Sequence, residues 1–435
     1  MKPRTLLSLG AVALLICSSC AESQAEEPGG SAAGKPLVAG SEAHQGSVSE
    51  PVSSSALADA ALADYRRELL DVAFEAATLM PVRTQIKDRS RAQERVVSGL
   101  LELGQHKTAH DCIVRIENWR RGLSLAHLAV ACVEAGSTVE DVAPFLAGAE
   151  RVAAGGEEVL RQAWRRDRIL ARIGTAYAKA GQHERALELE DDIGEDSESG
   201  RVAAAQAERA DEEACDRFLA SFDKALHSGS MDVLSHAVDA ALVYYDRYFD
   251  DEVRAGLIEA KLQSAVGRMP RELSVDSLLR MAEITAGHGK QERALLAVRE
   301  AREIMGAARW RPDDEIRLLS TFSETLHRIG RDDLALRDAD LSLEIFKAHG
   351  SEIQDFWRAD PLRCLAEALV ELGDKDRARD VYRRALEEGG RNPNARPRAN
   401  DLVGTCVSMA VHDVEPDAAM WETVTSLQGG LADPW

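Results

Sequence analysis

The first residues that could do chemistry are two histidines beside a carboxylate. His106 and His110 are four positions apart, so a helix would place both imidazoles on one face, next to Asp111. Two imidazoles and a carboxylate can bind a metal ion. The same spacing is common on solvated helices, however, and the sequence identifies no further ligand. We therefore predict no metal site.

Two other patterns match catalytic motifs only in part. The run from Gly287 to Lys290 is like a phosphate-binding loop, but it lacks the upstream Gly, and Gln291 stands where magnesium binding needs Ser or Thr. Ser221 and Lys224 have the S-x-x-K spacing of one hydrolase class without its companion motifs. We expect the chain not to be an enzyme and to need no cofactor.

The net charge argues against one large class of ligand. The chain has 53 Lys and Arg against 74 Asp and Glu, which gives a formal net charge of -21. This charge raises the electrostatic cost of approaching a phosphate backbone, so we do not expect nucleic-acid binding. Alternating, strand-like segments are nearly absent, which indicates a helical protein.

A recurrent pattern shows which elements would position a site. Apolar residues three and four apart are followed by a turn Gly and, five positions later, by a small residue, as in Ile173, Gly181 and Ala186. This spacing gives one helix an apolar stripe, ends the helix at Gly, and lets a second helix pack closely. Weaker copies lie in the middle of the chain, and a degenerate copy runs from Val403 to Ala419. The turn glycines are Gly104, Gly136, Gly181, Gly289, Gly330 and Gly373.

Three of these segments resemble tetratricopeptide (TPR) repeats. Residues 168–189, 278–301 and 362–385 match that family's apolar core, its turn Gly and the Ala that follows. The resemblance implies antiparallel helix pairs that stack side by side. We therefore predict an all-α fold, a right-handed superhelical α-solenoid of about nine TPR-like helical hairpins.

The predicted organisation follows from the dependence of each hairpin on its neighbours. One hairpin buries too few apolar side chains to offset its own conformational entropy, and the two ends of a stack need polar caps. We divide the chain into a lipoprotein-type signal peptide (1–20), a disordered tether (21–55), an N-terminal capping helix region (56–90), divergent short helical repeats (91–260), TPR-like repeats (261–395), and a degenerate last repeat with a C-terminal tail (396–435).

The first twenty residues have the features of an export signal. Lys2 and Arg4 precede an apolar run at 6–16, which is shorter than the about 20 residues of a membrane helix. Residues 14–20 resemble a bacterial lipobox, although Cys17 replaces the usual Leu, and the resemblance implies lipid attachment at Cys20. Simple cleavage and an uncleaved anchor are the alternatives. We expect an exported protein of a bacterial cell envelope, lipid-anchored in the outer membrane or periplasmic, that meets a membrane only through its lipid.

The cysteines beyond the signal peptide are odd in number. Cys132, Cys364 and Cys406 fall on or next to the apolar stripe of first helices, so we expect them to be small buried hydrophobic residues. Cys112 and Cys215 complete the set of five. In an oxidising compartment an odd count leaves at least one thiol free or paired between molecules.

The TPR resemblance also implies a binding surface. In that family, first-helix side chains that do not face the core line a concave groove. The groove mixes both charges and is net acidic, which favours a basic or polar ligand. Ordinary solvated helix faces joined by salt bridges are the alternative interpretation. The matching positions are Arg168, Lys179, Glu283, Arg317, Glu324, His327, Asp360, Arg363 and Glu367.

These expectations favour a non-enzymatic scaffold or adaptor that holds a protein or peptide partner in the groove. An envelope enzyme is one alternative, and it predicts a closed pocket with a groove carboxylate of strongly shifted pKa beside His327. A structural protein that self-associates through its end repeats is the other.

Overall fold

The computed structural model describes residues 57–155, 159, 161–194, 196–208 and 212–435. The predicted signal peptide, the tether and the lipid attachment at Cys20 lie outside these residues. Within them the fold is all-helical, apart from one isolated bridge between Asp59 and Gln105. None of the described helices combines the length and the apolar composition that crossing a membrane requires.

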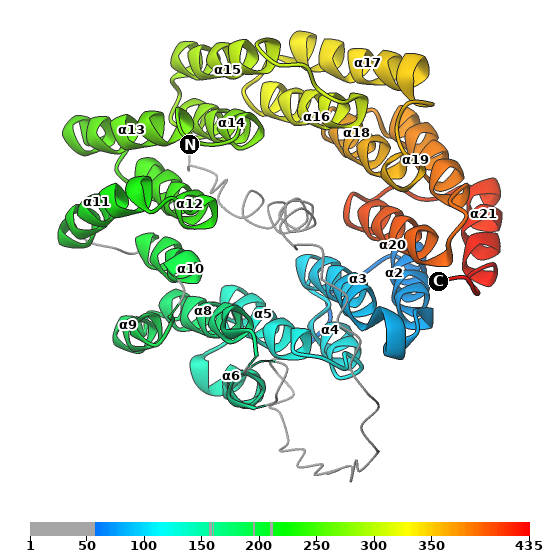
Figure 1. Cartoon of the computed structure of the whole chain (residues 1–435), viewed down its shortest axis with the longest axis horizontal. Helices are drawn as coiled ribbons and strands as arrows, with labels where there is room; N and C mark the ends of the chain where they lie inside the picture. Colours follow the sequence, from blue (N-terminus) through cyan, green and yellow to red (C-terminus); the bar gives the residue numbers. More distant parts are fainter. Residues whose placement is uncertain (1–56, 156–158, 160, 195, 209–211) are drawn as a thin grey trace, which may run out of the picture.

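The helices form two concentric layers around a centre (Figure 1). Each inner helix is followed in the chain by an outer helix, and neighbouring inner helices pack side by side. The inner helices are α3 (Val82–Glu102), α5 (Arg120–Glu134), α8 (Ala163–Lys179), α10 (Asp196–Ala207), α12 (Met231–Arg247), α14 (Arg271–Gly287), α16 (Pro312–Arg328), α18 (Ala359–Glu371) and α20 (Ala395–Val411). The outer helices are α4 (His106–Ile113), α6 (Val139–Ala154), α9 (His183–Asp191), α11 (Glu212–His227), α13 (Glu252–Val266), α15 (Gln291–Gly306), α17 (Asp332–His349), α19 (Lys375–Gly390) and α21 (Ala418–Gly429), while α2 (Asp64–Leu79) precedes the first pair and a short 3₁₀ helix, η1 (Asp355–Trp357), precedes α18.

The predicted turn glycines end inner helices. At Gly330, for example, φ is 79°, a left-handed conformation that Gly adopts without steric cost. Its N–H donates to the carbonyl of His327, and the next N–H, that of Arg331, donates to the carbonyl of Leu326, so two free carbonyls of the helix end are satisfied. This geometry confirms the predicted turns, because φ is also positive at Gly104, Gly136, Gly181, Gly289 and Gly373.

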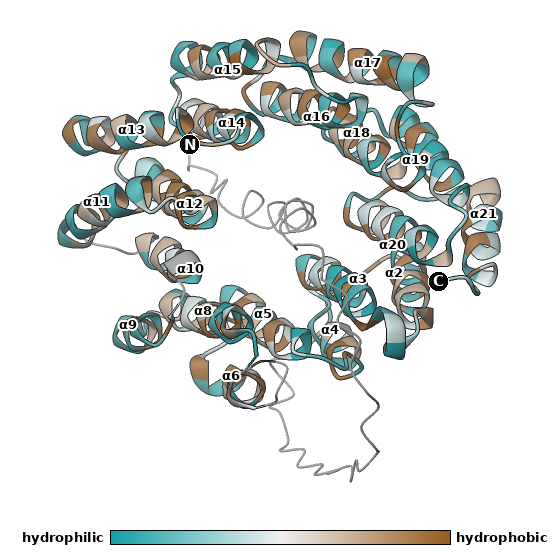
Figure 2. Ribbon diagram, viewed as in Figure 1, coloured by the Kyte–Doolittle hydropathy of each residue, from teal (hydrophilic) through white to brown (hydrophobic). Residues whose placement is uncertain are grey.

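After five of the six turn glycines, a small residue is buried between the two helices of a pair. Ala335 lies five positions after Gly330 and is fully buried, and its carbonyl accepts a hydrogen bond from the hydroxyl of Ser323 at 2.9 Å. Close approach of α16 and α17 requires a side chain of this size. The equivalent residues Ala109, Ala186, Ala294 and Ala378 are also fully buried. In Figure 2 most helices carry both hydrophobic and hydrophilic residues, as expected for helices that bury one face.

The two ends of the described chain meet. Helix α2 packs along α20, and α3 also contacts α20, so the array closes into a ring (Figure 1). A single hydrophobic cluster joins Leu69 and Val97 from the first helices with Leu365 and Val407 from the last. Gly99 of α3 faces Val407 so closely that a Cβ atom there would lie 2.8 Å from its Cγ1.

Ring closure concerns the two ends of the predicted array. The sequence predicts a capping helix region at 56–90 and a degenerate last repeat with a C-terminal tail at 396–435. Among the described residues, α20 and α21 form the last helix pair, and α2 is apolar where it meets its neighbours, with Leu69, Ala73 and Ala76 fully buried. Every residue of α20 from Leu402 to Ala410 is buried as well. Two such helices cannot end a stack in water, and each covers the other.

Candidate functional site

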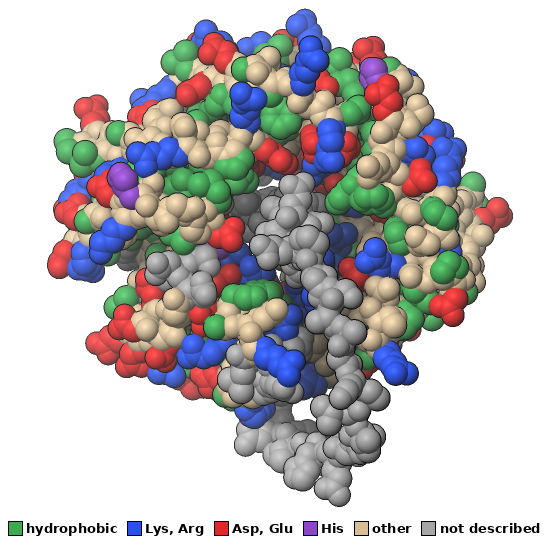
Figure 3. All heavy atoms as spheres, in the orientation of Figure 1, with side chains coloured by type: hydrophobic (Ala, Val, Ile, Leu, Met, Phe, Trp, Pro, Cys, Tyr) green, Lys and Arg blue, Asp and Glu red, His purple; other side chains and the backbone are tan. Residues whose placement is uncertain are grey.

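Helix α16 shows which side chains face the centre of the ring. It packs on its outer partner α17 and on the inner neighbours α14 and α18, which leaves one face uncovered. A stripe of partly exposed residues runs along that face with helical spacing: Arg317, Thr321, Glu324 and Arg328. Figure 3 shows that the molecule is hollowed at its centre. The uncovered face of α16, and those of the other inner helices, form the wall of this hollow.

Arg328 holds together the acidic side of this wall. Its guanidinium lies 3.1 Å from Glu283 on α14, 3.2 Å from Glu371 on α18 and 3.6 Å from Glu324 on its own helix. Burial raises the pKa of Glu324 to about 8, and repulsion from Glu367, Glu371 and Glu283 adds to the effect of burial. One guanidinium therefore bridges three inner helices, and the pKa of Glu324 beside it is raised although Arg328 opposes the shift.

The other cations predicted to line the groove also make cross-helix or local ion pairs. Lys179 lies 2.8 Å from both Glu134 and Glu208, and Arg168 lies 2.9 Å from Glu198. In this part of the groove, the predicted cations form salt bridges with carboxylates of neighbouring helices. These salt bridges join neighbouring inner helices and so stabilise the ring.

A second set of predicted groove residues, on α16 and α18, forms ion pairs within the groove. Arg317 pairs with Asp314 and lies 3.9 Å from Glu272. Arg363 pairs with Asp360 and lies 3.8 Å from Glu367. The Glu367 carboxylate also accepts a hydrogen bond from Ser408 of α20 at 2.5 Å. The structure thus places these residues on inner helices, as predicted, but in contacts with each other.

His327 is placed differently from the prediction. Its Nδ1 lies 2.8 Å from the carboxylate of Asp332 at the start of α17. The imidazole is therefore engaged at the turn between the two helices of a pair. Glu324 does have the raised pKa that the enzyme alternative predicts, whereas His327 is held by Asp332.

A cationic patch on the opposite side of the hollow was not predicted from the sequence. The guanidinium of Arg172 on α8 has no ion-pair partner among the described residues, and its buried Nε makes no hydrogen bond. Burial, followed by repulsion from Arg201, lowers the pKa of Arg172 to about 10. We call Arg120, Arg168, Arg172 and Arg201 the arginine patch.

Charges in the arginine patch are only partly balanced. Arg120 pairs with Glu94, while Arg168 and Arg201 share Glu198 at 2.9 and 3.0 Å. The carboxylates that these salt bridges place beside the patch are Glu94 and Glu198. His127 reports the resulting potential, because burial and then the four arginines of the patch hold its pKa well below the usual value for histidine. Lys and Arg side chains are visible on the wall of the hollow in Figure 3.

A sequence signal for this patch did exist. Arg168 and Arg172 are four positions apart on one helix, which places them on one face. Only Arg168 corresponds to a groove position of the TPR family, so the resemblance did not predict Arg172 as a groove residue. Arg120 on α5 and Arg201 on α10 join the patch only because these helices lie next to α8. A local sequence pattern does not reveal which helices are neighbours.

The candidate chemical motifs have structural roles. Burial lowers the pKa of both His106 and His110, and the ring of His110 packs 5.6 Å from that of Phe145. The Ser221 hydroxyl donates to the carbonyl of Phe218 at 2.8 Å. Gly289 lies in an interhelical turn with φ of 75°. Within the described ranges no three His, Cys, Asp or Glu side chains are grouped as a metal ion would require.

Fold and site together define a class, an all-helical repeat protein whose helix pairs close into a ring with a charged inner wall. No protein-family model matches the chain, and no curated protein matches it either. Among solved structures, it is similar to a circular tandem repeat protein with novel repeat topology and enhanced subunit contact surfaces. The identity is 15%, the match covers 84% of this chain and 96% of the other, and the TM-score is 0.24.

Proposed function

We propose that this protein is a non-enzymatic binding scaffold whose inner wall holds a segment of a protein partner. Its helix pairs are interpreted as TPR-like because five of them have the turn Gly and the Ala that follows it. The observation that carries the proposal is Arg172 of the arginine patch, whose guanidinium has no ion pair among the residues that the structure describes. An unpaired buried cation lowers stability, and a carboxylate supplied by a ligand would remove that cost.

The arginine patch favours a different ligand from the one the sequence suggested. The acidic groove residues Glu283, Glu324 and Glu367 already make contacts with Arg328, Arg363 and Ser408. The guanidinium of Arg172, by contrast, has no ion-pair partner among the described residues. We therefore propose an acidic peptide segment as the ligand, with carboxylates that pair with Arg172 and its neighbours.

A binding titration tests this proposal. Fluorescence anisotropy of a labelled poly-glutamate peptide would measure Kd for the wild type and for Arg172→Glu. We expect Kd to rise at least about tenfold in the variant, because one charge-assisted pair becomes a repulsion. Added salt should weaken wild-type binding as well. Equal Kd values for the two proteins would reject the arginine patch as the site.

Matched controls separate the site from the overall charge. Arg217→Glu makes the same charge change on the exposed face of outer helix α11, where Arg217 pairs with Glu213. This variant should bind the peptide like the wild type. Labelled poly-lysine should bind more weakly than poly-glutamate, although the net charge of -21 alone would favour the opposite order.

The setting of this scaffold is proposed from the sequence of the first 20 residues. We propose an exported, lipid-anchored protein of a bacterial envelope, attached through Cys20. Globomycin treatment of producing cells, or Cys20→Ser, should block lipid attachment and leave an unprocessed precursor on a gel. A photo-crosslinking residue at Ala131, one turn from His127 on α5, would then capture the partner for mass spectrometry.

A further inference from the structure

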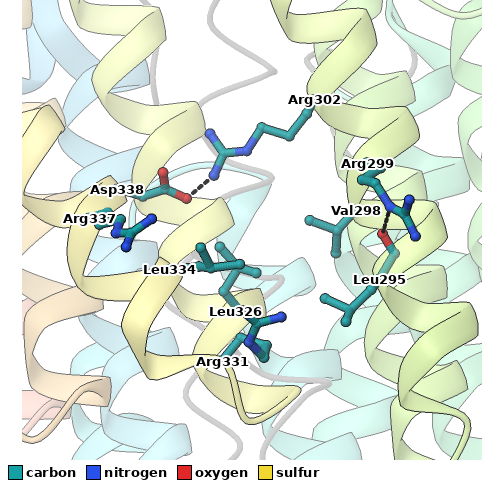
Figure 4. A pocket seen from close by; sticks show the side chains of 9 residues that line it. All are labelled: Leu295, Val298, Arg299, Arg302, Leu326, Arg331, Leu334, Arg337 and Asp338. Carbon is teal, nitrogen blue, oxygen red and sulfur yellow. Dashed lines mark hydrogen bonds and ion pairs between the residues drawn. The ribbon is translucent and has the colours of Figure 1, made fainter.

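The outer layer contains a cavity that is separate from the inner wall. It has a volume of about 470 Å³ and lies between α15 and α17. Leu326 of the inner helix α16 contributes to its lining (Figure 4). This volume falls in the range of about 300–1,000 Å³ that is typical of small-molecule sites.

The cavity combines an apolar strip with cationic ends. Figure 4 shows Leu295 and Val298 on α15 opposite Leu334 on α17, with Leu326 between the two helices. In the same view the guanidinium groups of Arg302 and Arg331 lie at opposite ends of this strip. A ligand in the cavity would therefore meet hydrocarbon along its length and positive charge at its ends.

The lining carries an excess of positive charge. Of its four arginines, Arg302 pairs with Asp338, the single carboxylate of the lining, and lies 4.0 Å above the ring of Phe322. Arg331 pairs with Asp333 at the surface, at 3.1 Å. The other two are Arg299 and Arg337, and neither has an ion-pair partner in the part of the chain that the structure describes.

We propose that this cavity binds a fatty acid, a carboxylate joined to an unbranched alkyl chain. The alkyl chain would cover Leu295, Val298, Leu326 and Leu334, and the carboxylate would pair with Arg337, which lies beside Asp338 in Figure 4. We choose a carboxylate ligand because of charge complementarity. The lining is cationic, although the protein has a net charge of -21. A cationic or neutral amphiphile of the same length would lack the ion pair.

Calorimetric titration with decanoate tests the proposal on the purified protein. We expect decanoate to bind at least about tenfold more tightly than decanol or decyltrimethylammonium, the difference that one charge-assisted pair supplies. Butyrate should bind far more weakly, because it covers little of the apolar strip. Equal affinity for decanoate and decanol, or no decanoate binding, would overturn the proposal.

Two substitutions locate the binding. Arg337→Ala removes an exposed guanidinium without an ion pair and should raise Kd for decanoate about tenfold. Leu334→Trp should fill the cavity and abolish binding, while Arg217→Ala on α11 should leave Kd unchanged. Circular dichroism checks that each variant is folded. Unchanged Kd in both cavity variants would place decanoate elsewhere and refute the site.

Discussion

The hydroxyl of Tyr65 donates a 2.6 Å hydrogen bond to the carboxylate of Asp413, 348 positions away in the chain. Asp413 also accepts a hydrogen bond from Lys375 at 2.8 Å, and Arg66 donates to the carbonyls of Ala410 and Val411 at the end of α20. The first described helix is thus attached to the last by polar contacts as well as by the shared core. These contacts form a specific interface at which the ring closes.

Substitution at this interface should open the ring or destabilise it. In Gly99→Leu the new side chain would collide with Val407, since the Cβ position already lies 2.8 Å from its Cγ1. We expect the free energy of unfolding to fall by about 1–3 kcal/mol, as in other overpacked cores. Urea denaturation measures this loss, and small-angle X-ray scattering would show any increase in the radius of gyration.

The control for Gly99 is Gly256 on α13. No atom lies within 4 Å of a Cβ built there, and the residue is exposed. Gly256→Leu should therefore leave the ring intact and raise stability by roughly 0.5–1 kcal/mol through helix propensity. If Gly99→Leu is as stable as the wild type, α3 and α20 do not pack as described.

Glu324 should make stability depend on pH. Its pKa rises from 4.5 in the unfolded chain to about 8 in the folded protein, so the folded state keeps a proton that the unfolded chain releases. Stability therefore falls as pH rises from about 4.5 to about 8. In Glu324→Gln this decrease should be smaller, as measured by urea denaturation at pH 5 and pH 8.5. Glu303→Gln, at an exposed position on α15, should show the wild-type decrease.

Arg172 and Arg168 should have opposite effects on stability. Arg172→Leu removes a cation without an ion pair from the arginine patch, so we expect the free energy of unfolding to rise by about 1 kcal/mol or more. Arg168→Leu removes one of the two partners of buried Glu198 and should lower it by about 1–3 kcal/mol. Thermal denaturation in parallel measures both, and destabilisation by Arg172→Leu would contradict the proposed cost.

The buried cysteines should be unreactive in the folded protein. Burial raises the pKa of Cys132 to about 11 and that of Cys406 to about 12, and both side chains are fully buried. Thiolate is the reactive form, so iodoacetamide at pH 8 should modify neither residue in native protein and both in urea. Peptide mapping by mass spectrometry measures the adducts. Rapid modification of Cys406 without denaturant would show that α20 is accessible.

Local features of this fold were predictable from the sequence because their causes are local. Turn glycines such as Gly330 and the Ala five positions later satisfy helix ends and interhelical packing within about thirty residues. The burial of Cys132 and Cys406 followed from their position on an apolar stripe. Cys364 is only partly buried, since it lies at the edge of its stripe on α18.

Closure and the pairing of the inner wall were not predictable in the same way. Contact between Gly99 and Val407 joins segments about three hundred positions apart, and no local pattern encodes it. One sign was present, because residues 402–410 are apolar or small on every face. Groove positions were assigned correctly to first helices, but partners such as Arg328 for Glu283 lie on another helix, which the pattern of one repeat cannot specify.

A closed ring of helix pairs also changes how the protein comes apart. In an open stack the outermost unit has one neighbour, so unfolding starts by fraying from an extremity. Here α2 and α20 shield each other, and loss of any pair breaks two interfaces at once. Hydrogen exchange should therefore find no weak extremity among the described helices, only a cooperative event that involves the whole circle.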